Sequence, residues 1–203
     1  AQTYMPDGPL MEKRKPIPLP TIRHIQSLCV DIGDDLRCII ALVSDTGARL
    51  AEICGLERSD VVLEGQHPHI IIRPNDCRSL KTRASERHIP LVGASLWAAT
   101  QAIQIFKVPY RKDEQFLFPR YTKGGKCNAN SASAALNKWL KSYVEEGCVI
   151  HSFRHSMRDR LRAVECPTDI VDSIGGWSKS GAGQNYGTGY PLDVLHKWLK
   201  LIE

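Results

Sequence analysis

The segment from His151 to Tyr186 places a histidine three residues before an arginine and ends on a tyrosine. On a helix, at about 100° per residue, its cationic side chains fall on one arc of roughly 100°. These side chains are His151, Arg154, His155, Arg158 and Arg162. Apolar residues fall on the opposite side, as expected of a face that packs on a core. A cationic ridge of this kind suits an anion, and the tyrosine is a nucleophile that could attack it.

Both features also have an ordinary structural explanation. Arginine and histidine on an amphipathic helix are usually solvated, and a tyrosine after a glycine-rich loop is usually a packing residue. A second stretch, Thr46–Leu56 (TGARLAEICGL), favours the chemical interpretation. Arg49 stands among apolar residues in a short predicted helix, where a guanidinium group costs free energy unless an anion meets it. We expect Glu52 to hold this guanidinium and Gly55 to end the helix in the left-handed conformation.

The combination of TGARLAEICGL, HSFRH, GGW and a tyrosine nine residues after Trp177 resembles the catalytic domain of the tyrosine recombinases, the family of phage integrases and chromosome-dimer resolvases. The resemblance runs from about Thr21 to the C-terminus. It implies an α+β fold that is mainly helical, with a small antiparallel three-stranded sheet. It also implies an enzyme that cleaves and rejoins double-stranded DNA through a covalent 3′-phosphotyrosyl intermediate, without metal, ATP or another cofactor.

The resemblance assigns a role to each residue of the expected site. The catalytic residues are Arg49, Lys81, His151, Arg154, Trp177 and Tyr186, with Glu52 and His155 in support. The two arginines hold the non-bridging phosphate oxygens, the tyrosine attacks phosphorus, and the lysine protonates the leaving 5′ oxygen. The histidine and the tryptophan add donors, and the histidine is also a candidate acceptor of the tyrosine proton. Many family members carry histidine where this chain has Trp177, and a minority carry tryptophan.

Some of these assignments leave alternatives. Arg83 and Arg78 are rivals of Lys81 for the hairpin position, and Tyr190 is the second candidate nucleophile. The spacing from Trp177 selects Tyr186, and Pro191 predicts that Tyr190 lies in a turn. Two other functions are compatible with the same resemblance. One is a type IB topoisomerase, which relaxes supercoils by the same chemistry, and the other is a non-catalytic DNA-binding module.

The hydrophobic pattern predicts the elements that must position these residues. Besides the cationic helix, we expect helices at Thr21–Leu28, Asp34–Ser44, Gly93–Val108, Ser131–Val144 and Pro167–Ile174, with Thr21 as N-cap of the first. Short strands of an antiparallel sheet are expected at Val61–Val62, His69–Arg73 and Arg87–Leu91. The final helix has one apolar face, formed by Leu192, Leu195, Trp198, Leu199 and Ile202. It either folds onto its own core or is donated to a neighbouring protomer in a homotetramer on DNA; without DNA a monomer is the alternative.

The chain divides into a short arm and one domain. Residues 1–20 hold five prolines and the basic cluster Lys13-Arg14-Lys15, which predicts either a disordered end or an extended linker on DNA phosphates. Residues 21–203 form the expected catalytic domain. The resemblance places a DNA-clamping domain before such a linker, so the chain is expected to be a fragment. Further DNA contacts are expected from Arg83, Arg120, Lys123, Lys126 and Arg158.

Composition narrows the class of protein. The formal net charge of +5 is compatible with a nucleic-acid partner. Seven scattered cysteines without a C-x-x-C pair predict reduced thiols in a cytoplasmic protein. No apolar run approaches the roughly 18 residues of a membrane span. No metal site is expected, because the acidic residues form no obvious paired set and His67 and His69 lack partner ligands.

Overall fold

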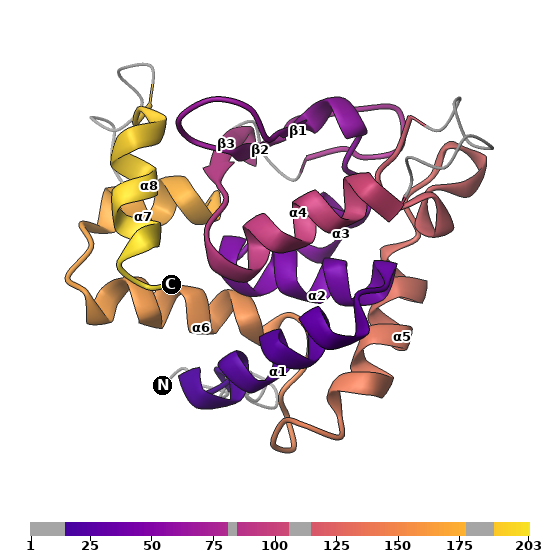
Figure 1. The fold of residues 1–203 in the computed structure, drawn as a ribbon, viewed down its shortest axis with the longest axis horizontal. Helices are drawn as coiled ribbons and strands as arrows, with labels where there is room; N and C mark the ends of the chain where they lie inside the picture. Colours follow the sequence, from indigo (N-terminus) through magenta and orange to yellow (C-terminus); the bar gives the residue numbers. More distant parts are fainter. Residues whose placement is uncertain (1–14, 81–84, 106–114, 178–188) are drawn as a thin grey trace, which may run out of the picture.

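The computed structural model describes residues 15–80, 85–105, 115–177 and 189–203. These residues form a mainly helical domain with one small sheet at its edge, at the top of Figure 1. The helices are α1 (Leu19–Ile32), α2 (Asp35–Thr46), α3 (Leu50–Cys54), α4 (Gly93–Ile105), α5 (Ala129–Leu140), α6 (Ser152–Ala163), α7 (Thr168–Gly175) and α8 (Leu192–Lys200). The strands are β1 (Val61–Val62), β2 (His69–Ile72) and β3 (Arg87–Pro90), and single 3-10 turns lie at Arg58–Asp60, Pro119–Tyr121 and Lys123–Gly125.

Helix α2 lies in the middle of the domain and contacts α1, α4, α6 and α3 (Figure 1). All its residues from Cys38 to Thr46 are buried. The fully buried carboxylate of Asp45 accepts hydrogen bonds from Gln26 on α1 (2.9 Å) and Arg160 on α6 (3.0 Å). It also accepts one from the backbone N–H of Ala94 in α4 (3.0 Å). One carboxylate therefore joins three helices to α2.

The sheet places an arginine on the core side. The strands pair antiparallel in the order β1-β2-β3, with Ile70 opposite Ile89 and Ile72 opposite Arg87. Because side chains alternate along a strand, these two pairs share one face. All four residues are buried. The three predicted strands are confirmed, each to within one residue at its ends.

Helix α1 begins at Leu19, two residues before the predicted start at Thr21. Pro18 occupies the N-cap position, so the prediction of Thr21 as N-cap was wrong. Pro20 lies in the first turn, where the N–H groups have no intrahelical partner and proline loses no hydrogen bond. The density of prolines therefore does not keep the chain extended up to residue 20.

Gly55 does not adopt the predicted left-handed conformation, since its φ is −94°. Its backbone N–H donates to the carbonyl oxygen of Ala51 and closes the helix without a positive φ. A Cβ at this position would lie 3.2 Å from the Cβ of Arg78. Close approach of that side chain accounts for the glycine here.

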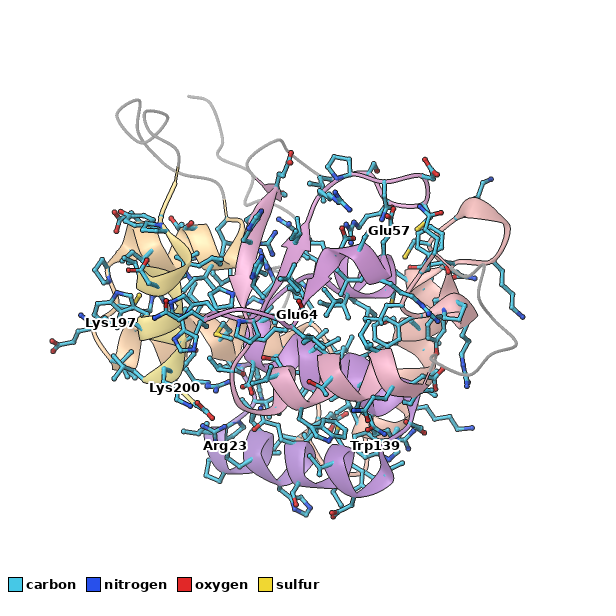
Figure 2. All side chains as sticks on the ribbon, turned by 45° about the horizontal axis from the view of Figure 1, so that its top comes forward. Arg23, Glu57, Glu64, Trp139, Lys197 and Lys200 are labelled. Atoms are coloured by element: carbon cyan, nitrogen blue, oxygen red, sulfur yellow. The ribbon has the colours of Figure 1, made fainter. Side chains whose placement is uncertain are left out.

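Helix α8 packs on its own chain, which is the first of the two alternatives for the C-terminal segment. Leu195 and Leu199 are buried, and the helix contacts β3. Arg23 of α1, labelled in Figure 2, and Arg160 of α6 both donate to the carbonyl oxygen of Ile202, just after the helix. This docking does not test exchange between protomers on DNA, which stays a prediction.

Two general expectations can be compared with the described ranges. None of their helices is both long and apolar enough to cross a membrane. All seven cysteines lie in these ranges and carry free thiols. Cys29, Cys38, Cys54 and Cys166 are buried and pack as small apolar side chains.

Gly47 connects α2 to the Arg49 segment with a left-handed φ of 60°. A Cβ at Gly47 would lie 2.8 Å from Cγ of Met157. We expect Gly47→Ala to lower the free energy of unfolding by about 2–3 kcal/mol, through left-handed strain and overpacking. Gly124→Ala is the matched control, with a φ of 70° and nothing within 4 Å of a Cβ, and should cost about 1 kcal/mol. Equal losses in urea unfolding would contradict the role of Met157.

Candidate active site

Arg49 lies at the N-cap position of α3, two residues after the turn at Gly47. Its Nη1 donates to Oε1 of Glu52 over 2.6 Å, and its backbone N–H donates to Oε2 over 2.8 Å. The ion pair that the spacing predicts is therefore present. Nη2 donates to the carbonyl oxygen of Gly176 over 3.2 Å, so the guanidinium group also contacts the segment that carries Trp177.

Glu52 is buried and binds a second arginine, Arg87 on β3. Nη2 of Arg87 lies 2.9 Å from Oε2 of Glu52, and Nε donates to the carbonyl oxygen of Ile174 over 2.8 Å. Burial alone would raise the pKa of Glu52, but the charge and hydrogen bonds of Arg87 and Arg49 outweigh it and lower the pKa. Glu52 is therefore an anion shared by two guanidinium groups.

Arg87 was not among the residues predicted for the site. A signal for it exists in the sequence, because alternation along the strand puts Arg87 on the same face as Ile89. An arginine on a core face needs buried acceptors or an anion as partners. The alternation predicted a strand here, and no partner was assigned to its inward-facing arginine.

Arg154 lies in the first turn of α6 and is only 4% exposed. Its Nη1 donates to the carbonyl oxygen of Gly47 over 2.6 Å, and its Nη2 has no hydrogen-bond partner among the described residues. Burial, together with the charges of Arg49 and Arg87, lowers the pKa of Arg154 to about 9. A buried cation with an unpaired donor favours the approach of an anion.

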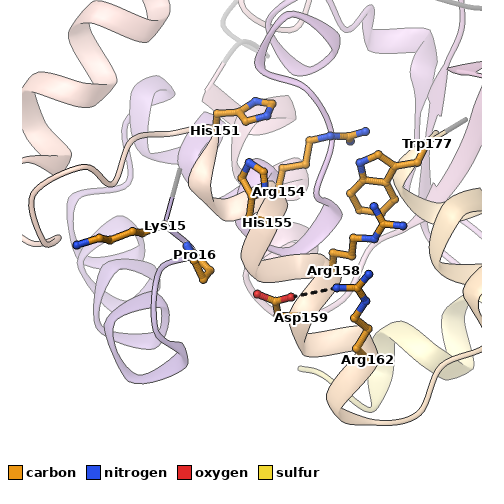
Figure 3. Close-up of a pocket in the computed structure, with 9 residues that line it drawn as sticks. All are labelled: Lys15, Pro16, His151, Arg154, His155, Arg158, Asp159, Arg162 and Trp177. Carbon is orange, nitrogen blue, oxygen red and sulfur yellow. Dashed lines mark ion pairs between the residues drawn. The ribbon is translucent and has the colours of Figure 1, made fainter. Parts of the chain in front are cut away.

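Trp177 follows α7, which ends at Gly176 with a left-handed φ of 59°. The centroid of a Trp177 ring lies 4.4 Å from Cζ of Arg154 and 5.0 Å from Cζ of Arg158. Arg158 is also paired with Asp172 on α7 at 3.2 Å. Cation–π contacts hold the indole beside the two guanidinium groups (Figure 3). The ion pair links Arg158 to α7, the helix that precedes Trp177.

A pocket of about 530 Å³ runs along α6 beside these side chains (Figure 3). It is lined by Lys15, Pro16, His151, Arg154, His155, Arg158, Asp159, Arg162 and Trp177. Four of the lining side chains are lysine or arginine and one is acidic. The positive potential of such a pocket attracts anionic ligands, and phosphate groups in particular.

Lys15 reaches this pocket because the segment before α1 crosses α6. The backbone N–H of Ile17 donates to Oγ of Ser156 over 2.7 Å, and this hydroxyl lies 2.9 Å from the carbonyl oxygen of Ile17. One residue of the predicted basic cluster therefore lies beside the cationic face of α6.

The remaining predicted residues have other positions. Five lie outside the residues that the structure describes: Lys13, Arg14, Lys81, Arg83 and Tyr186. Arg120 pairs with Asp35 at 2.9 Å, and Lys123 and Lys126 are exposed; none of these basic residues lines the pocket. Among the described residues, no three His, Cys, Asp or Glu side chains are grouped to hold a metal ion.

Two rivals of the predicted catalytic residues have partners of their own. Arg78 is buried, and its Nη1 donates to the backbone carbonyl of Glu52 over 2.6 Å. The hydroxyl group of Tyr190 donates to Asp169 on α7, and this hydrogen bond raises the pKa of Tyr190. These contacts argue against Arg78 and Tyr190, while Lys81, Arg83 and Tyr186 lie outside the described residues.

The sequence matches the phage integrase family over residues 23–190, and the chain therefore belongs to this family. A comparison with curated proteins finds no match. Among solved structures, the Tn1549 transposon integrase in complex with a circular intermediate DNA is 20% identical, with a TM-score of 0.66 over 98% of this chain and 68% of that one. XerA recombinase is 14% identical, with a TM-score of 0.66 over 97% of this chain and 66% of that one.

XerH site-specific recombinase, in a post-cleavage complex with its palindromic difH substrate, is 15% identical. Its TM-score is 0.62, over 94% of this chain and 50% of the XerH chain. At these identities the likeness concerns the fold. The predicted class, mainly helical with a three-stranded antiparallel sheet, is therefore confirmed.

Replacing Arg154 by methionine tests the cost of burying its charge. Methionine fills a similar volume without charge, so we expect Arg154→Met to be as stable as the wild type or more stable by about 1–2 kcal/mol. Inorganic phosphate should raise the Tm of the wild type by mass action and leave that of the variant unchanged. Lys138→Met, which removes an exposed charge on α5 that does not line the pocket, should keep the phosphate response. An Arg154→Met variant whose Tm still rises with phosphate would contradict the binding of an anion by Arg154.

Proposed function

We propose that this chain is the catalytic domain of a site-specific DNA recombinase, which cuts a DNA strand and joins it to another through a covalent tyrosine intermediate. One observation carries the proposal. Arg154 binds the carbonyl oxygen of Gly47, two residues before Arg49, while its Nη2 has no partner among the described residues. Two arginines from distant parts of the sequence are thus close enough for their charges to interact, and Arg154 lines the cationic pocket. Such a pair suits the two non-bridging oxygens of a phosphodiester.

The proposed site stabilises the charge that develops during phosphoryl transfer. Attack on a phosphodiester passes through a pentavalent phosphate with extra negative charge. Cationic donors that are already in place stabilise this charge without reorganisation. In the proposal Arg49 and Arg154 hold the non-bridging oxygens, while His151 and Trp177 donate further hydrogen bonds.

Tyr186 is the proposed nucleophile and Lys81 the proposed general acid. The phenolic oxygen attacks phosphorus, and His151 accepts the phenolic proton. The bond from phosphorus to the 5′ oxygen breaks, and that oxygen takes a proton from Lys81. The products are a 3′-phosphotyrosyl link and a 5′-hydroxyl group. Attack by the 5′-hydroxyl of another strand reverses both steps, so the ester retains the bond energy and ATP is not consumed.

Double-stranded DNA is the proposed partner. The Tn1549 integrase and XerH structures are complexes with DNA, which supports this assignment. Lys15 and Arg158 at the pocket are proposed phosphate contacts. Further proposed contacts are Lys13, Arg14, Arg83, Arg120, Lys123 and Lys126. Assembly of four chains on DNA belongs to the same proposal, and exchange of α8 would require its release from β3.

Two observations favour recombination over the alternatives. The similar structures are named as an integrase and recombinases, which supports strand exchange over relaxation by a topoisomerase. A binding-only module has no need of a buried arginine with an unpaired donor, and surface lysines would serve it as well. The position of Arg154 therefore supports catalysis.

The nucleophile can be tested with nicked duplexes that carry a candidate target sequence, incubated without divalent metal and analysed on a denaturing gel. We expect a covalent adduct with the wild-type chain and none with Tyr186→Phe, which lacks the attacking oxygen. Tyr190→Phe is the control and should retain the adduct, because the hydroxyl of Tyr190 binds Asp169. Loss of the adduct in Tyr190→Phe alone would assign the nucleophile to Tyr190. A wild-type chain without adduct on any DNA would favour the binding module.

The general acid can be tested with a leaving group that needs no proton. Lys81→Ala should slow cleavage of ordinary DNA by about 100- to 1000-fold. With sulfur in place of the bridging 5′ oxygen the loss should nearly disappear, since a thiol has a pKa of about 8.5 and leaves as the thiolate. Arg83→Ala should show no such rescue. Rescue of Arg83→Ala in place of Lys81→Ala would exchange their roles.

A further inference from the structure

Arg87 is held by protein oxygens on several sides. The residue is only 8% exposed, and its guanidinium group donates to four acceptors. These are both carboxylate oxygens of Glu52 and the backbone carbonyls of Ser85 and Ile174. With its donors engaged in this way, Arg87 is placed to act on other residues of the site and not on a phosphate group directly.

The charges around Glu52 show what Arg87 contributes. Oε1 of Glu52 lies 2.6 Å from Arg49, and Oε2 lies 2.9 Å from Arg87. With Arg49 alone the pair would be neutral, and a phosphate would compete with the carboxylate for the same guanidinium group. With Arg87 present, two cations share one anion and a net positive charge remains. At low effective dielectric this charge strengthens the attraction between Arg49 and a phosphate.

Arg87 also fixes the chain just before Trp177. Its Nε binds the carbonyl oxygen of Ile174 over 2.8 Å, and a Cβ on Gly176 would lie only 2.6 Å from its Nη1. Arg49 binds the carbonyl oxygen of Gly176 over 3.2 Å. The two arginines that share Glu52 therefore both hold the end of α7, from which Trp177 reaches Arg154.

We propose that Arg87 is a positioning residue for DNA cleavage: it neutralises Glu52 and fixes the end of α7, so that Arg49 and Trp177 are held in place for the scissile phosphate. This inference rests on the proposed function, because Arg87 acts through a residue that binds the phosphate in that proposal.

The first test compares single-turnover adduct formation on a nicked duplex with the dissociation constant for the same DNA. Arg87→Gln should slow adduct formation on the order of 100-fold, as expected when preorganised charge is lost. The dissociation constant should change less than about threefold, because other phosphate contacts remain. Arg87→Lys retains the charge without the bidentate geometry and should recover the rate to within about tenfold of the wild type.

Arg160→Gln is the matched control. Arg160 is also 8% exposed and binds a buried carboxylate, Asp45, but it contacts neither Glu52 nor the end of α7 in the described structure. We expect this variant to lose stability while the folded molecules cleave within about threefold of the wild-type rate. Thermal unfolding of each variant gives the folded fraction by which the rates are corrected.

The second test asks whether Arg87 acts through Arg49. In the Arg49→Lys background, Arg87→Gln should slow adduct formation by less than about a further tenfold, because the effects of residues that act as a unit are not additive. Losses that multiply in full, a wild-type rate in Arg87→Gln, or an Arg87→Lys variant as slow as Arg87→Gln would overturn the inference. A wild-type chain that forms no adduct would instead defeat the proposed function, and the inference with it.

Discussion

The guanidinium groups of Arg49 and Arg87 bind a single buried carboxylate, that of Glu52, and the charge of a third, Arg154, interacts with all three. Burial and mutual repulsion disfavour such an arrangement, and the lowered pKa of Arg154 expresses this cost. Hydrogen bonds to the backbone carbonyls of Gly47, Ile174 and Gly176 satisfy several of the donors and hold the cations apart. The remaining positive charge lies where the dielectric is low, and there it stabilises a developing anion most strongly.

Helix α2 connects this cluster to the rest of the domain. Asp45 near its C-terminal end binds α1, α4 and α6, so the helix that precedes Gly47 packs against the helix that carries Arg154. The left-handed turn at Gly47 then directs the chain to Arg49, and its carbonyl oxygen accepts from Arg154. A glycine serves both needs, because a side chain would strain the turn and meet Met157. Placement of the two arginines thus depends on contacts far apart in the sequence.

Local periodicity predicted the helices and strands well, because it reports which face of each element is buried. The ion pair of Arg49 with Glu52 followed from their spacing on one turn. The meeting of Arg49 with Arg154 and Trp177 came from the family resemblance, since no local pattern specifies contacts across a hundred residues. Arg87 was missed because its partner, Glu52, comes from another element. The roles of Lys81 and Tyr186 stay predictions, as both residues lie outside the described structure.

The tryptophan at position 177 fits the charges around it. Arg154 and Arg158 both approach the Trp177 side chain, at 4.4 and 5.0 Å. A histidine here would be a hydrogen-bond donor that can also take a proton, and two neighbouring cations would oppose its charged form. An indole donates through its N–H without carrying charge, and its π face attracts cations. Trp177 therefore keeps a donor at the site and offsets part of the repulsion between Arg154 and Arg158. Arg158 and Trp177 therefore complement each other. The positive charge of Arg158 on α6 would disfavour a protonated histidine at position 177, but it attracts the π face of an indole at the same place.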